Sequence, residues 1–415
     1  MDSFVEKGLL NQQRPTLNRR KALASTLLSL FAVGTLPFLY QLYAKYPPSG
    51  ITALTESPRY KTKLQTMGPI KGSPDPWSVV QLARALFLDG QALIEVVRLQ
   101  AWTQAAAHSE QPKAFRCQQR SIFQMLNDGI RVFDMRYAYN PGNDTIGFYH
   151  SRALLAPTTT LTDVLFGFYY WLERHPTETV LLSFNHEGNT GTVEDEKLQR
   201  MILDTFSAPS DSDDSLASQI KRRFWVQERG ALGTLGESRG KAILLQRFSY
   251  SRLSSPPDPS QLIGLDLGAD RWTDNGDNIA LVYNKDTNAT AFIEDRYSIT
   301  LDPSTPSSVD AYITSKFNYT TAHLERATQQ GDSADQLFIS FASAAVLPDP
   351  SGQFTMFPVT YALGEDGVRG MNERLLEWFE ARRGQGSRFG AIMLDFYDAV
   401  PGLIEAFLDV EKQES

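Results

Sequence analysis

From Cys117 onward, short apolar or β-branched runs alternate with amphipathic stretches of helical period. Strands that are connected by helices lie parallel in a sheet or barrel, so this alternation limits the chain to that class of fold. The clearest helix is expected over 161–173, where apolar residues form one stripe behind a capping box of Thr160 and Asp163. Further helices are expected over 192–206 and 366–383, and strands over 130–137, 179–185, 242–248, 291–299, 337–342 and 390–397.

The length of 415 residues allows two or three domains, but one α/β barrel can also take up about 250 to more than 400 residues. No internal repeat of fixed period is visible, so we expect one barrel-like domain behind an N-terminal anchor. The expected parts are a basic cytosolic tail at 1–21, a transmembrane or signal-anchor helix at 22–44, a linker with a divergent N-terminal part of the barrel at 45–114, and the main part of the barrel at 115–415.

The composition excludes some classes of function. A formal net charge of −8 leaves no excess of cationic residues to neutralise a phosphate backbone, which argues against general nucleic-acid binding. A local phosphate site is still compatible with this charge. Cys117 is the only cysteine, so an intrachain disulfide and a multi-cysteine zinc site are excluded, and we expect Cys117 to be a small buried residue.

Residues 22–44 carry no formal charge and follow the basic cluster Arg19, Arg20 and Lys21. At 1.5 Å per residue such a stretch is long enough to cross about 30 Å of hydrocarbon. The basic flank should stay in the cytosol, which predicts a single-pass membrane protein whose part after Lys45 is lumenal or extracellular. A cleaved signal peptide, and hence a secreted protein, is one alternative, and a buried soluble helix is another.

Three N-x-[ST] triplets begin at Asn143, Asn288 and Asn318, all in the part that is predicted to be translocated. Such triplets occur often by chance. They agree with an outer location and are predicted glycosylation sites.

The strand expected over 130–137 places Asp134 and Arg136 on the same face, because successive side chains of a strand point to opposite sides. An uncompensated charge inside a barrel is costly, so an acid and a base at the C-terminal end of one strand indicate a site. A structural ion pair explains the same two residues, and this strand alone does not decide between the two interpretations.

Polar residues also stand at the ends of other expected strands. His150 ends a second extended stretch, and an imidazole can protonate a leaving alkoxide at neutral pH, although a structural role is the common one for a lone histidine. Asn185 and Glu187, at the end of the strand expected over 179–185, are two residues apart and therefore point to the same side. Asp395 follows the run AIML, where it either caps the next turn or orients a catalytic base. Barrel enzymes keep their sites at such strand ends.

The stretch 115–150 resembles the X-region of phosphatidylinositol-specific phospholipase C and its fungal PLC-like phosphodiesterase relatives. It combines, in order, a Q-x-x-S segment, a Q-x-L-N-D-G-I-R entry from helix to strand, a D-x-R motif, and a histidine about a dozen residues later. The resemblance covers about 115–408, with further similar segments at 173–187, 239–248, 291–299 and 391–398.

This resemblance implies an irregular TIM-type (β/α)8 barrel that cleaves phosphodiesters of phospholipid or phosphoinositide head groups by general acid and base catalysis. Arg136 is similar to the arginine that replaces a calcium ion in bacterial-type members, and Asp134 to its accompanying carboxylate. His150 resembles the general acid and Asp395 the late aspartate that orients the first histidine. Asn185 and Glu187 lie where relatives place substrate or metal contacts. No cofactor is implied, although Ca²⁺ or Mg²⁺ is a less favoured possibility.

The chain departs from the family at the general base. Members carry a glycine, a threonine or serine, and then a histidine shortly before the Cys117 segment, and this motif is absent here. The nearest imitation, 70–75, has Pro74 in place of the histidine, and His108 lacks the preceding glycine. The leading hypothesis is therefore a phosphoric diester hydrolase. The alternatives are a pseudoenzyme that binds phosphorylated head groups, and a metal-dependent glycerophosphodiesterase-like enzyme that uses Asp134 and Glu187.

Overall fold

A computed structural model describes residues 112–410, apart from short gaps at 157–158, 211, 331–335 and 347–354. The predicted anchor at 22–44 and nearly all of the predicted linker at 45–114 lie outside these residues. Among the helices that are described, none has the length and apolar character that a bilayer span requires.

One sheet is formed mainly by the first half of the described chain. It has six strands in the order β3-β2-β1-β4-β5-β6. Within it β1, β4, β5 and β6 are parallel, whereas β2 is antiparallel to both β1 and β3. The strands are β1 (Val132–Tyr139), β2 (Ile146–His150), β3 (Ala153–Leu154), β4 (Thr179–His186), β5 (Lys241–Arg247) and β6 (Leu265–Asp266).

A second sheet has four strands in the order β12-β9-β8-β7, where β8, β9 and β12 are parallel and β7 forms an antiparallel hairpin with β8. These strands are β7 (Ile279–Asn284), β8 (Ala289–Glu294), β9 (Gln336–Phe341) and β12 (Ala391–Met393). A short antiparallel pair is formed by β10 (Gly364–Glu365) and β11 (Val368–Arg369).

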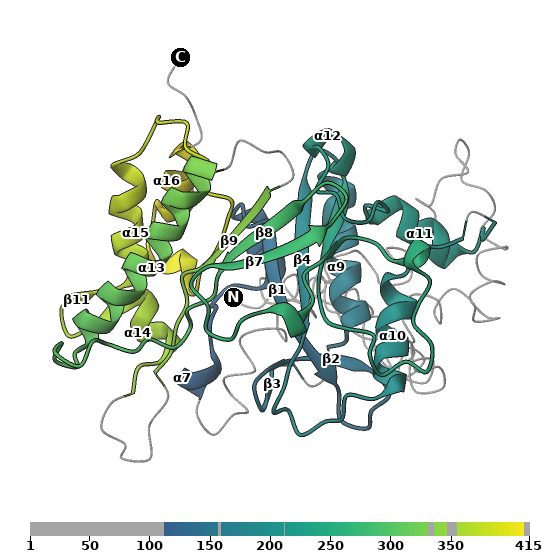
Figure 1. The fold of residues 1–415 in the computed structure, drawn as a ribbon, viewed down its shortest axis with the longest axis horizontal. Coiled ribbons are helices and arrows are strands. Elements are labelled where there is room, and N and C mark those ends of the chain that lie inside the picture. The colour runs from purple at the N-terminus through teal and green to yellow at the C-terminus, as the bar shows by residue number, and fades with distance from the viewer. Residues whose placement is uncertain (1–111, 157–158, 211, 331–335, 347–354, 411–415) are drawn as a thin grey trace, which may run out of the picture. The chain divides into compact units, whose positions relative to one another are not determined.

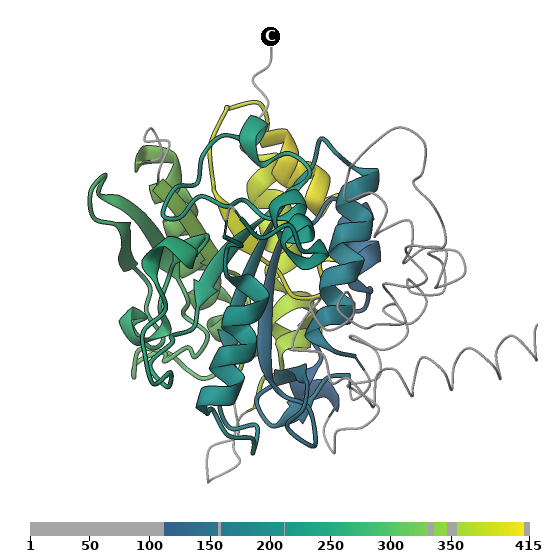
Figure 2. The same ribbon diagram turned by 90° about the vertical axis from the view of Figure 1, so that its right-hand side faces the viewer.

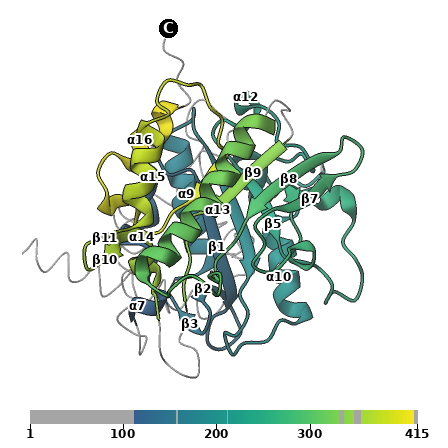
Figure 3. The same cartoon turned by 60° about the vertical axis from the view of Figure 1, so that its left-hand side comes forward.

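Two groups of helices lie on opposite sides of the strands in Figure 1, and Figure 2 shows the molecule from the side of α10 and α11. The first group is α8 (Ile122–Asn127), α9 (Leu161–Arg174), α10 (Glu196–Phe206), α11 (Leu216–Phe224) and α12 (Leu235–Ser238). The second group is α13 (Val309–Gln330), α14 (Pro358–Leu363), α15 (Met371–Glu380) and α16 (Leu403–Val410), with α13 packed against β8 and β9 (Figure 3). The remaining short helices are α7 (Pro112–Phe115), η1 (Pro259–Gln261), η2 (Ala269–Arg271) and η3 (Tyr397–Ala399).

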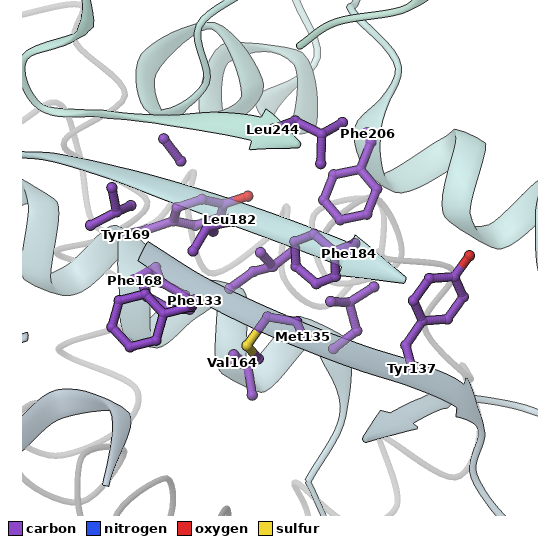
Figure 4. Close-up of a cluster of buried hydrophobic side chains, with 14 of the residues drawn as sticks. Phe133, Met135, Tyr137, Val164, Phe168, Tyr169, Leu182, Phe184, Phe206 and Leu244 are labelled. Atoms are coloured by element: carbon purple, nitrogen blue, oxygen red, sulfur yellow. The ribbon is translucent and has the colours of Figure 1, made fainter. Parts of the chain in front are cut away.

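Side-chain alternation along β1 separates two cores, as the sequence predicts. Phe133, Met135 and Tyr137 are buried against the first group of helices, where the rings of Phe133 and Phe168 of α9 meet edge to face at 5.0 Å between centroids (Figure 4). Val132, from the other face, packs with residues such as Leu245 and Ile339 in the core between the sheets. Asp134 and Arg136 share the parity of Val132, so they stand above this inner core.

The mixed α/β fold resembles a TIM-type barrel, and its strands and helices do not alternate regularly, in keeping with the irregular barrel that the sequence predicts. Within the described residues no backbone ladder joins the two sheets, and hairpins interrupt the parallel order. The β1–β2 turn contains Gly142 and Asn143, whose φ angles of 97° and 57° are left-handed. Such turn residues fold a strand back on itself directly, so no crossover helix follows β1.

Several expected elements have different bounds. The capping box of Thr160 and Asp163 is confirmed at the start of α9. The helix expected over 192–206 begins only at Glu196, because Asp195 caps it, and the helix expected over 366–383 is shortened to α15 by β11. The strands expected over 291–299 and 390–397 end earlier, at Glu294 and Met393, because the chain leaves the ladder there.

Replacing Phe168 by alanine should remove a fully buried ring from the core around α9. We expect the free energy of unfolding, measured by urea denaturation, to fall by about 3–5 kcal/mol. Leu235→Ala is the control, since this side chain is 60% exposed and its loss should change stability by less than about 0.5 kcal/mol. Similar losses in both variants would contradict the packing described for α9.

Candidate active site

Arg136 lies between two carboxylates at the end of β1. Its Nε donates to Oδ2 of Asp134 at 2.8 Å, and its Nη1 lies 3.3 Å from Oε2 of Glu187. Glu187 is buried, and its other oxygen accepts from the backbone N–H of Ser151 at 2.5 Å. The guanidinium is therefore fixed on two sides while its side chain stays 35% exposed, which leaves donors available to an anion from solvent.

Asp134 also pairs with a second arginine, Arg247, which was not among the predicted site residues. Its Oδ1 accepts from Nη1 of Arg247 at 2.8 Å and from the hydroxyl of Ser183 at 3.0 Å. Burial raises the pKa of Asp134, but the charges of Arg136 and Arg247 and the hydrogen bonds from Arg136 and Ser183 outweigh it and lower the pKa to about 2. Asp134 is thus a carboxylate at neutral pH, so it acts as an anchor for two cations.

Arg247 is held on its other side by aromatic and acidic groups. Its Cζ lies 3.8 Å from the ring centroid of Trp272, and its Nη2 lies 3.9 Å from Oδ2 of Asp295. The indole N–H of Trp272 donates to the same Asp295 oxygen at 3.1 Å. Burial is the largest effect on Arg247 and lowers its pKa, yet a guanidinium still remains charged in proteins. The signal that could have revealed Arg247 is its place at the end of the strand KAILLQR.

The register of the first sheet explains why these groups meet. Asp134 pairs with Ser183 across β1 and β4, and Arg136 pairs with Asn185, which in turn pairs with Arg247 across β4 and β5. Residues in register on parallel strands share one face, so Asn185 lies between the two arginines at the strand ends.

His150 reaches the same region by a different route. Strand β2 runs antiparallel to β1, with Tyr139 opposite Ile146 and Tyr137 opposite Phe148. His150, the last residue of β2, therefore lies next to the part of β1 that carries Asp134 and Arg136. Nδ1 of His150 lies 2.9 Å from the carbonyl oxygen of Phe115, which can only accept, so Nδ1 carries a proton. Nε2 is then the nitrogen that can exchange a proton with a ligand.

Cys117 connects His150 to Asp395. Its Sγ lies 3.8 Å from Nδ1 of His150, and its thiol is hydrogen-bonded to the carboxyl of Asp395. Burial raises the pKa of Cys117 well above its ordinary value, the charge of Asp395 raises it further, and Arg136 is near enough to lower it. The expectation of a small buried residue is incomplete: the residue is half-buried, its thiol is the buried part, and it contacts two of the predicted site residues.

The structure thus gathers the predicted site residues into two adjoining groups. Asp134, Arg136 and Glu187 form one group by direct ion pairs, with Asn185 beside them in register, and His150 and Asp395 form the other through Cys117. Over the residues that are described, no three His, Cys, Asp or Glu side chains are placed to hold a metal ion together.

The three predicted glycosylation sites differ in their surroundings. Asn143 and Asn288 are exposed in the β1–β2 and β7–β8 turns, and Asn318 is exposed on α13. The hydroxyl of Thr320, which completes the third triplet, is buried and donates to Glu294. Thr290, which completes the second triplet, is also buried, whereas Thr145 of the first is half-buried, so the first triplet is the best placed predicted acceptor.

Replacing Asp134 by alanine should leave the buried guanidinium of Arg247, whose side chain is only 6% exposed, without its closest anion. We expect the free energy of unfolding to fall by about 3–5 kcal/mol, as for other broken buried ion pairs, measured by urea denaturation at neutral pH.

The matched control is Asp144→Ala. The ion pair of Asp144 with Lys197 spans 3.3 Å between side chains that are 66% and 56% exposed, so its loss should cost at most about 1 kcal/mol. Equal losses in the two variants would show that Asp134 is not the anchor described above.

Comparisons with known proteins address the fold. No family model matches the chain, and no curated protein matches it in sequence. Among solved structures, a variant of the phosphatidylinositol-specific phospholipase C of Staphylococcus aureus is 18% identical with a TM-score of 0.52, over 74% of this chain and 90% of that one. Another structure of that enzyme is also 18% identical with a TM-score of 0.52, over 76% and 93% of the two chains. At this identity the likeness concerns the fold alone, and the chain has a mixed α/β fold similar to the TIM-type barrel of bacterial phosphatidylinositol-specific phospholipase C.

Proposed function

We propose that the chain is a phosphoric diester hydrolase of the phospholipase C type. The observation that carries this proposal is the placement of Arg136, fixed by Asp134 and Glu187 and still partly exposed, beside the group formed by Cys117, His150 and Asp395. An oriented guanidinium next to proton-transfer groups is what cleavage of a phosphodiester requires.

In the proposed reaction, Arg136 binds the phosphate oxygens and stabilises the negative charge that grows on them in the transition state. Its two carboxylate partners hold it in one orientation, so little reorganisation is needed when the reaction begins. His150 donates a proton from Nε2 to the departing alcohol, while the carbonyl of Phe115 keeps the ring oriented through Nδ1.

The substrate class that we propose is a phospholipid or phosphoinositide head group. Two observations support it: the solved structures of similar fold are named phosphatidylinositol-specific phospholipases C, and Arg136, Glu187 and the half-buried Asn185 gather at the same strand ends. Side chains of both charges suit a ligand with a phosphate and several hydroxyls. A membrane anchor at 22–44 would place such a site near lipid, and we keep it as part of the proposal.

A second candidate function is binding of the same head groups without cleavage. It is favoured by one observation: within the described residues, the carboxyl of Asp395 is hydrogen-bonded to the thiol of Cys117 and not to an imidazole that could serve as general base. The metal-dependent alternative has less support, because Asp134 and Glu187 already pair with arginines.

Replacing Arg136 by alanine should reduce cleavage of phosphatidylinositol by roughly 10²–10³-fold or more in kcat, because the growing charge on phosphate loses its stabiliser. The measurement is the release of water-soluble phosphate from mixed phosphatidylinositol vesicles. Arg200→Ala is the control, since this arginine is exposed and pairs with Glu196 on α10. Unchanged release by the Arg136 variant would reject the assignment.

Two further assays separate the candidates. We expect wild-type release to persist in EDTA and to fall about 10²–10⁴-fold in His150→Ala, since a general acid is lost. Release that disappears with EDTA and returns with Mg²⁺ or Ca²⁺ would favour the metal-dependent alternative. Tight binding of the vesicles with no release by the wild type would favour the pseudoenzyme.

A further inference from the structure

The backbone around Asp395 is held in a strained conformation. Phe396, the next residue, has a φ of 47°, a left-handed value that is unfavourable for a non-glycine residue. Its N–H donates to the carbonyl of Cys117 at 2.8 Å, and Nδ2 of the buried Asn372 donates to the carbonyls of Asp395 at 2.9 Å and of Phe396 at 3.1 Å. Three hydrogen bonds therefore fix the direction in which the Asp395 side chain leaves the chain.

That direction is toward the candidate active site. Ala391 and Met393 of β12 pack in the core between the sheets, and Asp395 follows two residues after the strand ends. The thiol of Cys117 meets its carboxyl, and the same thiol contacts His150 and is influenced by the charge of Arg136. Asp395 thus adjoins the Cys117 thiol, which is also in contact with His150.

The charged and titratable groups that face Asp395 come from two other elements. From the segment after α7, Cys117 donates its thiol hydrogen, which favours the carboxylate. From α13, the charge of Lys316 also favours the carboxylate, although Lys316 is directly paired with Glu294 at 2.6 Å. Burial is the strongest effect and outweighs both, so the pKa of Asp395 rises to about 7.

We propose that Asp395 is itself the general base of this chain, oriented by the Cys117 thiol, and that it removes the proton from the hydroxyl that attacks phosphorus. The inference rests on the proposed phosphodiesterase function. It gives Asp395 a direct part in the reaction in place of the orienting part that the family resemblance implies. A carboxyl that is half ionised near neutral pH is a far stronger base than an ordinary aspartate.

In the proposed step, each bond that forms is matched by a bond that breaks, and the protons are conserved. The attacking O–H bond breaks, its proton goes to the Asp395 carboxylate, and its oxygen forms the new bond to phosphorus. The bond from phosphorus to the leaving oxygen breaks, and that oxygen takes a proton from Nε2 of His150. Asp395 ends protonated and His150 neutral, so one proton lost to water and one gained from water restore the starting state.

An activated leaving group separates the two proton-transfer roles. On an inositol phosphodiester with p-nitrophenol as leaving group, His150→Ala should regain most of the activity that it loses on phosphatidylinositol, because nitrophenolate departs without a proton. Asp395→Ala should stay about 10²–10⁴-fold below wild type on both substrates, and added formate should restore its activity at least about tenfold by replacing the lost carboxylate. Asp395→Asn, which preserves shape, should show the same loss, and Glu405→Ala, which removes an exposed carboxylate from α16, is the control.

The pH dependence of kcat/KM tests the part played by Cys117. Asp395 must be ionised to accept a proton, so activity should rise with pH through its pKa of about 7. Because the thiol hydrogen bond lowers this pKa, Cys117→Ala should move the rising limb to higher pH, and Cys117→Ser, which keeps a donor, should move it back. A limb that does not move in Cys117→Ala would overturn the orienting role.

Failure of the general-base role of Asp395 can be distinguished from failure of the proposed phosphodiesterase function. If the wild type cleaves the phosphodiester and Arg136→Ala does not, while Asp395→Ala stays active or is not rescued by formate, then another group is the base. That result overturns the present inference and leaves the proposed function intact. A wild type that cleaves neither substrate overturns both.

Discussion

The carboxylate of Asp134 holds two guanidinium groups, and the arrangement of the strand ends depends on this contact. One oxygen binds Arg136 and the other binds Arg247, each at 2.8 Å. Two cations this close would repel each other in a partly buried site, so a fixed anion between them is needed to keep both in place. Since Arg247 is also held by Trp272, it fixes Asp134 from the side of β5, and this in turn limits the freedom of Arg136.

The groups that we propose for proton transfer are placed by the backbone. His150 comes to the site because the β1–β2 hairpin turns the chain back, and Asp395 because β12 ends in the strained turn at Phe396. The two meet at Cys117. A cationic group fixed by carboxylates therefore adjoins a histidine and an aspartate fixed by turns, which is the arrangement that the proposed phosphodiester cleavage needs.

Local periodicity was enough to predict part of this site. The spacing of two residues places Asp134 and Arg136 on one face of any strand, whatever the rest of the fold. The contact of Arg247 with Asp134 depends on the register of three strands, which no local pattern contains. Helix α13 was missed for a related reason: its buried face includes Lys316, Thr320 and other polar residues, so it lacks a clear apolar stripe. The antiparallel hairpins depend on turn residues that alternation alone does not reveal.

Phosphorus NMR of phosphatidylinositol vesicles incubated with the purified full-length chain tests the central claim most directly, because it observes the diester and its product without a label. The account predicts that the diester resonance declines in the presence of EDTA and that a resonance of a water-soluble inositol phosphate grows in step with it. A diester resonance that stays constant over many hours, at protein concentrations at which the vesicles are bound, would contradict it.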